Sequence, residues 1–187
     1  MKYLQAILVC IMVLVLAGAA NAQQLKFPPG LDRLASKAAE VVDVTMDRQM
    51  LNFAGKFLSD RDPDDVEARK LIQNLNGIYV KSFEFDKPGE YSPADIEMFR
   101  SQLKPPVWSK MVEARSKRDG ENVEVYIKTE NGAAMGMAII AAEPQELTLV
   151  NIDGPINPEQ LSQLGGQFGI PKVDVQPKAQ TSKGPNK

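Results

Sequence analysis

Acidic side chains are the groups of this 187-residue chain best suited to chemistry. Residues 60–65 are Asp-Arg-Asp-Pro-Asp-Asp, and closely spaced carboxylates are typical ligands of a hard cation such as calcium. An EF-hand loop beginning at Asp60 would need Gly and Glu where this chain has Asp65 and Leu71. A helix start is the alternative, because the oxygen of Asp62 can cap a helix whose first residue is Pro63. We therefore predict a helix cap there and no metal site.

A second acidic group surrounds the loop after the strand expected at residues 78–85. Two of its members could act as the acid and base of a hydrolase; they are Glu84, Asp86, Glu90 and Asp95. Nothing in the sequence makes two of them converge, so solvated carboxylates are the alternative. The chain has no His, the commonest general base and metal ligand. We predict no catalytic, cofactor-binding or metal-binding residue, and a carboxylate-dependent hydrolase stays open as the alternative.

The first 22 residues have the pattern of an export signal. Lys2 precedes an apolar run at residues 4–16, and Ala20-Asn21-Ala22 is a small-residue cleavage site. The run is short for a lasting membrane anchor, so we expect cleavage and no stable membrane span; an uncleaved anchor is the alternative. Cys10, the only cysteine, lies in this signal, so the mature chain has no thiol. We expect an exported protein, either periplasmic or secreted.

The chain should then form one domain. Residues 23–30 are a polar segment, 31–170 the folded domain, and 171–187 a disordered tail rich in Lys, Pro, Gln and Ser. Residues Asn157-Pro158 predict the start of a last short helix. The 22 basic and 24 acidic residues show no basic stripe, which argues against nucleic-acid binding.

Four consecutive strands are predicted between Trp108 and Asp153. Residues 123–128 alternate, so that one face should be buried and the other, with Glu124, Tyr126 and Lys128, should face water. Asn131-Gly132 is a strong signal for a two-residue hairpin turn.

Helices and one further strand precede these four. Residues 78–85 predict a strand, whereas the β-branched run 41–44 fits either a strand or a helix connection. Thr45 is a candidate cap for a helix whose buried stripe would comprise Met50, Leu51, Ala54, Phe57 and Leu58. Ser92-Pro93 predicts another helix start. The order predicts an α+β fold with a mixed or antiparallel sheet of about five strands, a C-terminal four-strand meander, and helices mainly on one face.

Apolar side chains of the sheet are the candidates for binding. The possible ligand or partner face comprises Tyr79, Phe83, Trp108, Met135 and Met137, because methionines beside small residues can form an adaptable groove. Ordinary core packing is the alternative for all five.

Three segments together resemble the DUF4252 family of exported bacterial proteins whose function is uncharacterised. They are residues 40–45 (EVVDVT), 75–85 (LNGIYVKSFEF) and 142–148 (AEPQELT), and the likeness covers about residues 31–164. The resemblance implies an α+β domain and an envelope or secreted location, and it carries no catalytic residues over to this chain.

The leading hypothesis is an exported, non-enzymatic accessory or binding module of the bacterial cell envelope. Its partner would be an unknown envelope protein or a small apolar ligand, without a cofactor. Besides the hydrolase, a structural envelope component stays open, and such a component would associate with itself.

Overall fold

The computed structural model describes residues 25–156. Two 3-10 turns are present, η1 at Pro29–Leu31 and η2 at Gly55–Phe57. The helices are α2 (Asp32–Ala35), α3 (Arg48–Ala54), α4 (Pro63–Asn74) and α5 (Pro93–Arg100). The strands are β1 (Glu40–Asp47), β2 (Gly77–Glu84), β3 (Trp108–Arg115), β4 (Asn122–Glu130), β5 (Ala133–Ala142) and β6 (Glu146–Asp153). The α+β class is confirmed.

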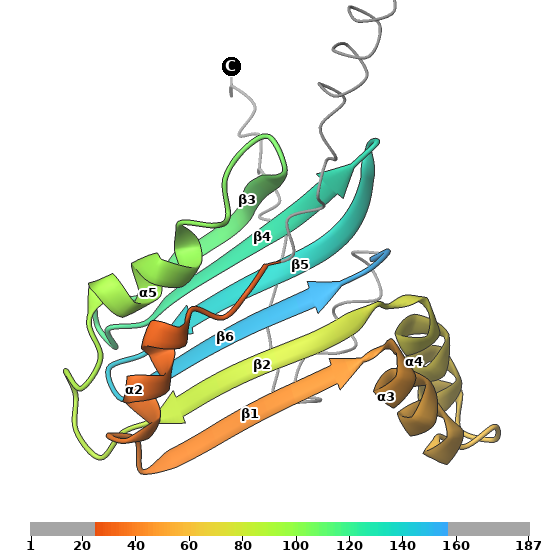
Figure 1. Cartoon of the computed structure of the whole chain (residues 1–187), viewed down its shortest axis with the longest axis horizontal. Coiled ribbons are helices and arrows are strands. Elements are labelled where there is room, and N and C mark those ends of the chain that lie inside the picture. Colours follow the sequence, from red (N-terminus) through yellow and green to blue (C-terminus); the bar gives the residue numbers. More distant parts are fainter. Residues whose placement is uncertain (1–24, 157–187) are drawn as a thin grey trace, which may run out of the picture.

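All strands belong to one sheet in the order β1-β2-β6-β5-β4-β3, and every neighbouring pair is antiparallel (Figure 1). The last four strands are joined consecutively as a meander. The segment after β2 crosses one face of the sheet through α5 and enters β3 at the far edge. β1 and β3 are therefore the two edge strands.

Local chemistry explains the sharp turns and the start of α5. Asn131 and Gly132 have φ values of 51° and 80°, so both hairpin residues adopt the positive φ that a type I′ turn requires. At the start of α5, the Asp95 carboxylate accepts hydrogen bonds from the Ser92 N–H (2.8 Å) and hydroxyl (2.7 Å). Both bonds are donated by Ser92, the N-cap residue, to Asp95 in the first turn, and they mark the helix start expected at Ser92-Pro93.

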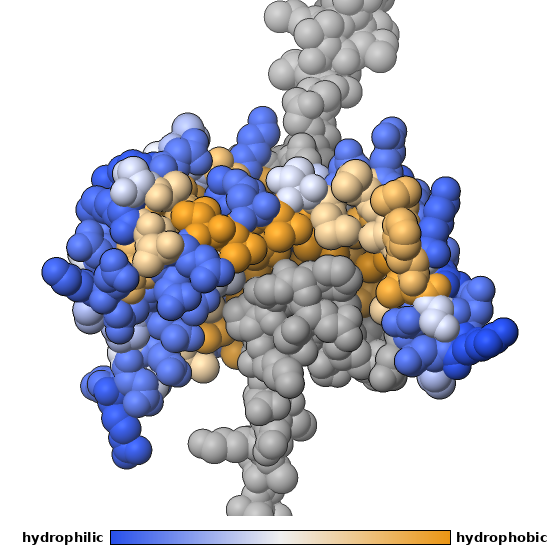
Figure 2. Space-filling view, turned by 90° about the horizontal axis from the view of Figure 1, so that it is seen from below, coloured by the Kyte–Doolittle hydropathy of each residue, from blue (hydrophilic) through white to orange (hydrophobic). Residues whose placement is uncertain are grey.

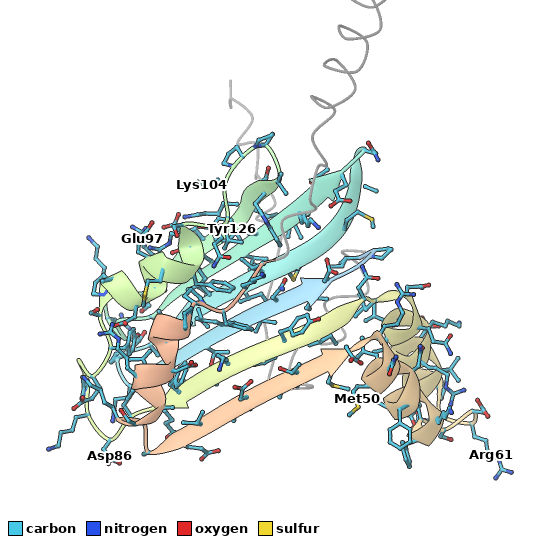
Figure 3. The ribbon with its side chains drawn as sticks, viewed as in Figure 1. Met50, Arg61, Asp86, Glu97, Lys104 and Tyr126 are labelled. Atoms are coloured by element: carbon cyan, nitrogen blue, oxygen red, sulfur yellow. The ribbon has the colours of Figure 1, made fainter. Side chains whose placement is uncertain are left out.

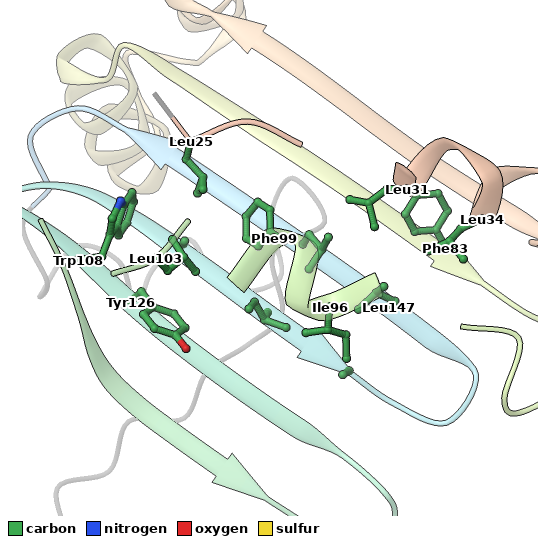
Figure 4. Close-up of a cluster of buried hydrophobic side chains, with 14 of the residues drawn as sticks. Leu25, Leu31, Leu34, Phe83, Ile96, Phe99, Leu103, Trp108, Tyr126 and Leu147 are labelled. Atoms are coloured by element: carbon green, nitrogen blue, oxygen red, sulfur yellow. The ribbon is translucent and has the colours of Figure 1, made fainter. Parts of the chain in front are cut away.

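The sheet carries an apolar core on each face. Under α2 and α5, the first core packs Phe99, Ile96 and Leu103 of the α5 region against sheet residues such as Phe83 and Leu149 (Figure 4). The second core joins the buried side chains of α3 and α4 to the opposite face; its members include Leu51, Leu71, Leu75, Ile78, Val80, Met137, Ile139 and Val150. Because both faces are covered, β5 and β6 are buried along most of their length, and β5 contains only apolar residues and glycine.

Three expectations about the sheet and its helices are wrong. The face with Glu124, Tyr126 and Lys128 does not face water: all three residues are buried, because α5 and the segment before α2 cover this side of β4. The sheet has six strands rather than about five, since residues 40–47 pair with the whole of β2. Helices contact both faces rather than mainly one.

The helix after β1 also differs from its prediction. Asp47, not Thr45, is the N-cap, and its carboxylate accepts from the Met50 N–H at 2.9 Å. Only Leu51 of the expected stripe is deeply buried, whereas Met50 and Phe57 are exposed. The reason is position: α3 follows the end of an edge strand, so only one of its sides meets the sheet (Figure 1).

Several expectations fall outside residues 25–156: the export signal at 1–22, the last helix from Asn157, and the tail at 171–187. Among the residues that the structure describes, no helix is long and apolar enough to cross a membrane.

Candidate interaction surface

Edge strand β1 is a regular, eight-residue strand with one side unpaired. Its β-branched residues suit a pleated strand, and it runs without a bulge from Glu40 opposite Glu84 to Asp47 opposite Gly77. No described segment lies along its outer side (Figure 1). A long, unbulged edge strand is a template for pairing with another chain.

The register shows which peptide groups of β1 are free to pair. In an antiparallel pair, hydrogen-bonded residues alternate along each strand. The Phe85 N–H donates to the Gln145 carbonyl at 2.8 Å, and these two residues are opposite each other in the β2–β6 register. The odd-numbered residues of β2 therefore form their backbone hydrogen bonds with β6. The even-numbered residues of β2 form theirs with β1. Their β1 partners are also even-numbered. The N–H and C=O groups of Val41, Asp43 and Thr45 therefore point outward, and within residues 25–156 no other segment bonds to them.

Exposed apolar side chains accompany this edge. Val41 and Val42 on β1 have exposed fractions of 42% and 37%, and Met50, Phe53 and Phe57 just beyond the strand reach 51%, 55% and 75%. The two phenylalanine rings contact each other edge to face, with centroids 5.0 Å apart. Figure 2 views the molecule from the β1 side and shows hydrophobic atoms between hydrophilic groups on the coloured part of this face. We call these five side chains, with the outer side of β1, the β1 edge surface.

Charge on the β1 edge surface is largely balanced at its centre. The Lys81 ammonium lies 2.7 Å from the Asp43 carboxylate and 3.5 Å from that of Asp32. The hydrogen bond with Asp43 outweighs burial and raises the pKa of Lys81. Arg48 donates to the side chain of Asn76 at the end of the strand. An incoming strand would thus meet one ammonium and two carboxylates at the centre, a net charge of −1.

The structure separates the five side chains predicted as a binding face. Tyr79, Phe83 and Trp108 share the α5 side of the sheet, where Phe83 and Trp108 are buried in the first core. Met137 is buried in the second core, on the opposite face. Met135 is the additional residue of a bulge between β4 and β5. Contact of these residues with a ligand stays a prediction, but they do not form one surface.

The acidic residues around the loop after β2 have separate surroundings. Asp95 is buried as the cap of α5 and pairs with Arg33. Glu90 lies 3.6 Å from Lys37, and Glu84 ends β2 in register with Glu40 and Glu146. Asp86 is exposed at the end of the sheet opposite to Met50 (Figure 3). In residues 25–156, no group of three or more acidic residues could hold a metal ion.

The buried carboxylate of Glu124 connects β3, the second edge strand, to α5 and β4. Glu124 is 1% exposed and accepts hydrogen bonds from Arg100 (3.1 Å to Nε), Tyr126 (2.6 Å) and Asn122 (3.0 Å), while the Lys110 ammonium lies 3.0 Å away. Tyr126 lies beside α5 in Figure 3. Burial alone would raise the pKa of Glu124, but these partners outweigh it and lower the pKa to about 2. Glu124 thus joins donors from α5, β3 and β4, and this cluster stabilises the packing of α5 and β3 against β4.

Sequence reasoning missed both the β1 edge surface and the Glu124 cluster. The run at 41–44 was a signal for the first, because an apolar strand at the start of a domain can be an edge. Phe53 and Phe57 were a second signal, since they lie one helical turn apart and outside the buried side marked by Leu51. No sequence pattern indicated the Glu124 cluster, because the partners of Glu124 come from three separate elements, α5, β3 and β4.

The fold and this surface define a small α+β domain with one open sheet edge. The chain belongs to the family described as "Domain of unknown function (DUF4252)", whose model matches residues 36–164. That match begins just before β1 and includes every strand of the sheet. No curated protein and no solved structure matches the chain significantly.

Proposed function

We propose that the protein is an exported, non-enzymatic binding module of the bacterial cell envelope that holds a protein partner by strand addition to β1. The observation that carries this proposal is the regular β1 edge with outward peptide groups beside exposed valine, methionine and phenylalanine side chains. Strand addition derives affinity from main-chain hydrogen bonds and specificity from the neighbouring side chains. Export rests on the sequence pattern of residues 1–22.

A protein partner fits better than a small apolar ligand. The apolar side chains follow a strand edge and the helix beyond it, a shape that an extended segment can match along its whole length. The hydrolase alternative has no observation in its favour, because Asp95 is used as a helix cap and Glu90 pairs with Lys37.

Site-specific photocrosslinking in intact cells tests the proposal. A photoreactive residue replaces Val41 on β1 or, as the matched control, Met111, which is similarly exposed on the opposite edge strand β3. We expect a discrete protein adduct from position 41 and none from position 111. Equal adducts from both positions, or none from position 41, would overturn the proposal; crosslinking of only a small molecule would favour the ligand alternative over it.

A second variant tests the hydrolase. Glu84→Gln, Asp86→Asn and Glu90→Gln are combined, and Asp95 is left intact because its loss would remove the α5 cap. The binding proposal predicts an unchanged adduct at position 41 and an unchanged cellular phenotype. Loss of the phenotype with an intact fold and adduct would favour catalysis.

A further inference from the structure

The sequence of β1 is complementary to itself when two copies run antiparallel. Only registers that place odd-numbered residues opposite odd-numbered residues can use the outward peptide groups of Val41, Asp43 and Thr45. One of these registers places Val44 opposite Val44 of the other strand. In this register, the peptide groups of Asp43 form hydrogen bonds with those of Thr45 in the other strand. No acidic residue then lies opposite an acidic residue anywhere along β1, because Asp47 meets Val41.

We infer that the strand added to β1 is β1 of a second copy of this chain, paired antiparallel with Val44 on the two-fold axis. This inference rests on the proposed use of β1 for strand addition. A two-fold contact of this kind is self-complementary and closes on itself, so it gives a dimer rather than a fibre. The two six-stranded sheets then form one continuous sheet.

This register places compatible side chains opposite each other. On the second-core face, Val42 of each copy lies opposite the partner's Met46, next to the central pair of Val44 side chains. At each end, Glu40 lies opposite the partner's Arg48, a pairing of opposite charges. The neighbouring register, centred on Asp43, would place two carboxylates opposite each other and loses this pairing.

The exposed apolar side chains beyond β1 gain a role in the dimer. α3 follows β1 directly, so Met50 and Phe53 lie at the end of the strand where the start of the second copy's β1 arrives. Burial of such side chains adds the hydrophobic contribution that a strand pair alone lacks. This explains why they remain exposed in a single copy.

Disulfide trapping tests both the dimer and its register. The full chain carries Cys10→Ser, which leaves an introduced cysteine as the only thiol. Val44 opposite Val44 is a non-hydrogen-bonded pair with a Cα separation of about 4.5 Å, which is within the range of a disulfide. We expect Val44→Cys to form a covalent dimer on mild oxidation, and the matched controls Asp43→Cys and Thr45→Cys to remain unlinked. A mixture of Val42→Cys and Met46→Cys chains should link only between the two types.

The mass of the unmodified chain in solution provides the second measurement. We expect a dimer by sedimentation, and we expect Thr45→Pro to give a folded monomer, because proline removes an outward N–H that bonds to no described residue. Val41→Lys provides an independent variant if the proline variant fails to fold.

The outcomes separate this inference from the proposed function. A monomeric chain without a Val44→Cys dimer, but with a discrete adduct at position 41 in cells, overturns the second-copy inference and leaves strand addition standing. A dimer that persists in Thr45→Pro and Val41→Lys overturns the second-copy inference, whereas the absence of an adduct at position 41 overturns the proposed strand addition itself. Linking by Asp43→Cys in place of Val44→Cys overturns the register and therefore the inference.

Discussion

The two edge strands of the sheet differ in whether their free sides can pair with another strand. In β3, the register shifts between Lys110 and Val112, so that Met111 is an additional, bulged residue. β1 is regular along its whole length and carries exposed valines. Bulges and charged side chains prevent edge-to-edge pairing, whereas a flat apolar edge permits it. The comparison shows that the β3 edge is closed to strand pairing, whereas the β1 edge is open to it.

The edges also differ in how firmly the fold holds them. β3 is tied to the sheet and to α5 by the Glu124 cluster, which collects donors from Arg100, Lys110, Tyr126 and Asn122. The corresponding polar contact of β1 is the partly exposed Lys81–Asp43 pair. Polar groups therefore fix the closed edge, while the open edge depends on its ladder to β2 and on apolar packing.

The largest expected effect is the loss of stability when the Glu124 carboxylate is removed from the closed edge. Glu124→Gln leaves Arg100 and Lys110 without their common anion, and we expect the free energy of unfolding in urea to fall by about 3 kcal/mol. Glu113→Gln is the matched control, because Glu113 is a more exposed partner of the same Lys110 and should cost less than about 1 kcal/mol. Equal losses in both variants would contradict the difference between buried and exposed pairs.

Acid should weaken the closed edge through the same carboxylate. The pKa of Glu124 is about 2 in the folded protein against an ordinary 4.5, so its contribution to stability is complete above pH 4.5 and is lost as the pH falls toward 2. We expect the unfolding free energy of the unmodified chain to fall more steeply across this window than that of Glu124→Gln. Parallel pH profiles of the two proteins would show that Glu124 does not couple folding to protonation.

A lysine introduced at each edge compares the two directly. Val42→Lys should weaken self-association by roughly tenfold, or about 1.4 kcal/mol, because it places a charge on the open edge. Met111→Lys adds the same charge to the bulged edge and should leave the dissociation constant unchanged. Sedimentation equilibrium gives both constants, and a larger effect of Met111→Lys would assign the association to β3.

The smallest expected effect concerns the ion pair of the open edge. Lys81→Met should lower the unfolding free energy by only about 0.5 kcal/mol, because Asp43 is half exposed and water replaces the lost ammonium. Urea denaturation measures this loss. A cost similar to that of Glu124→Gln would mean that the two edges are held with equal strength.

Local signals predicted the elements whose chemistry is contained in a few adjacent residues. The Asn131-Gly132 hairpin, the Ser92 capping box and the helix starting at Pro63 appear where those residues indicate. The four-strand meander follows for the same reason, since each strand bonds to the next along the chain. Residues 41–44 stayed ambiguous, because a short run with three valines fits a strand or a connection until β2 supplies the pairing partner.

The sequence by itself determined the α+β class, the turns and caps, and the absence of histidine. Only the tertiary structure decided which apolar side chains are buried: Leu51 and Phe57 are both apolar residues after β1, yet one contacts the sheet and the other is exposed. It also decided that Glu124 is buried, because its partners arrive from three elements. Periodicity reports which residues share a side of an element, whereas burial depends on what packs against that side. That is why the edge of the sheet, the basis of the proposed function, emerged only from the fold.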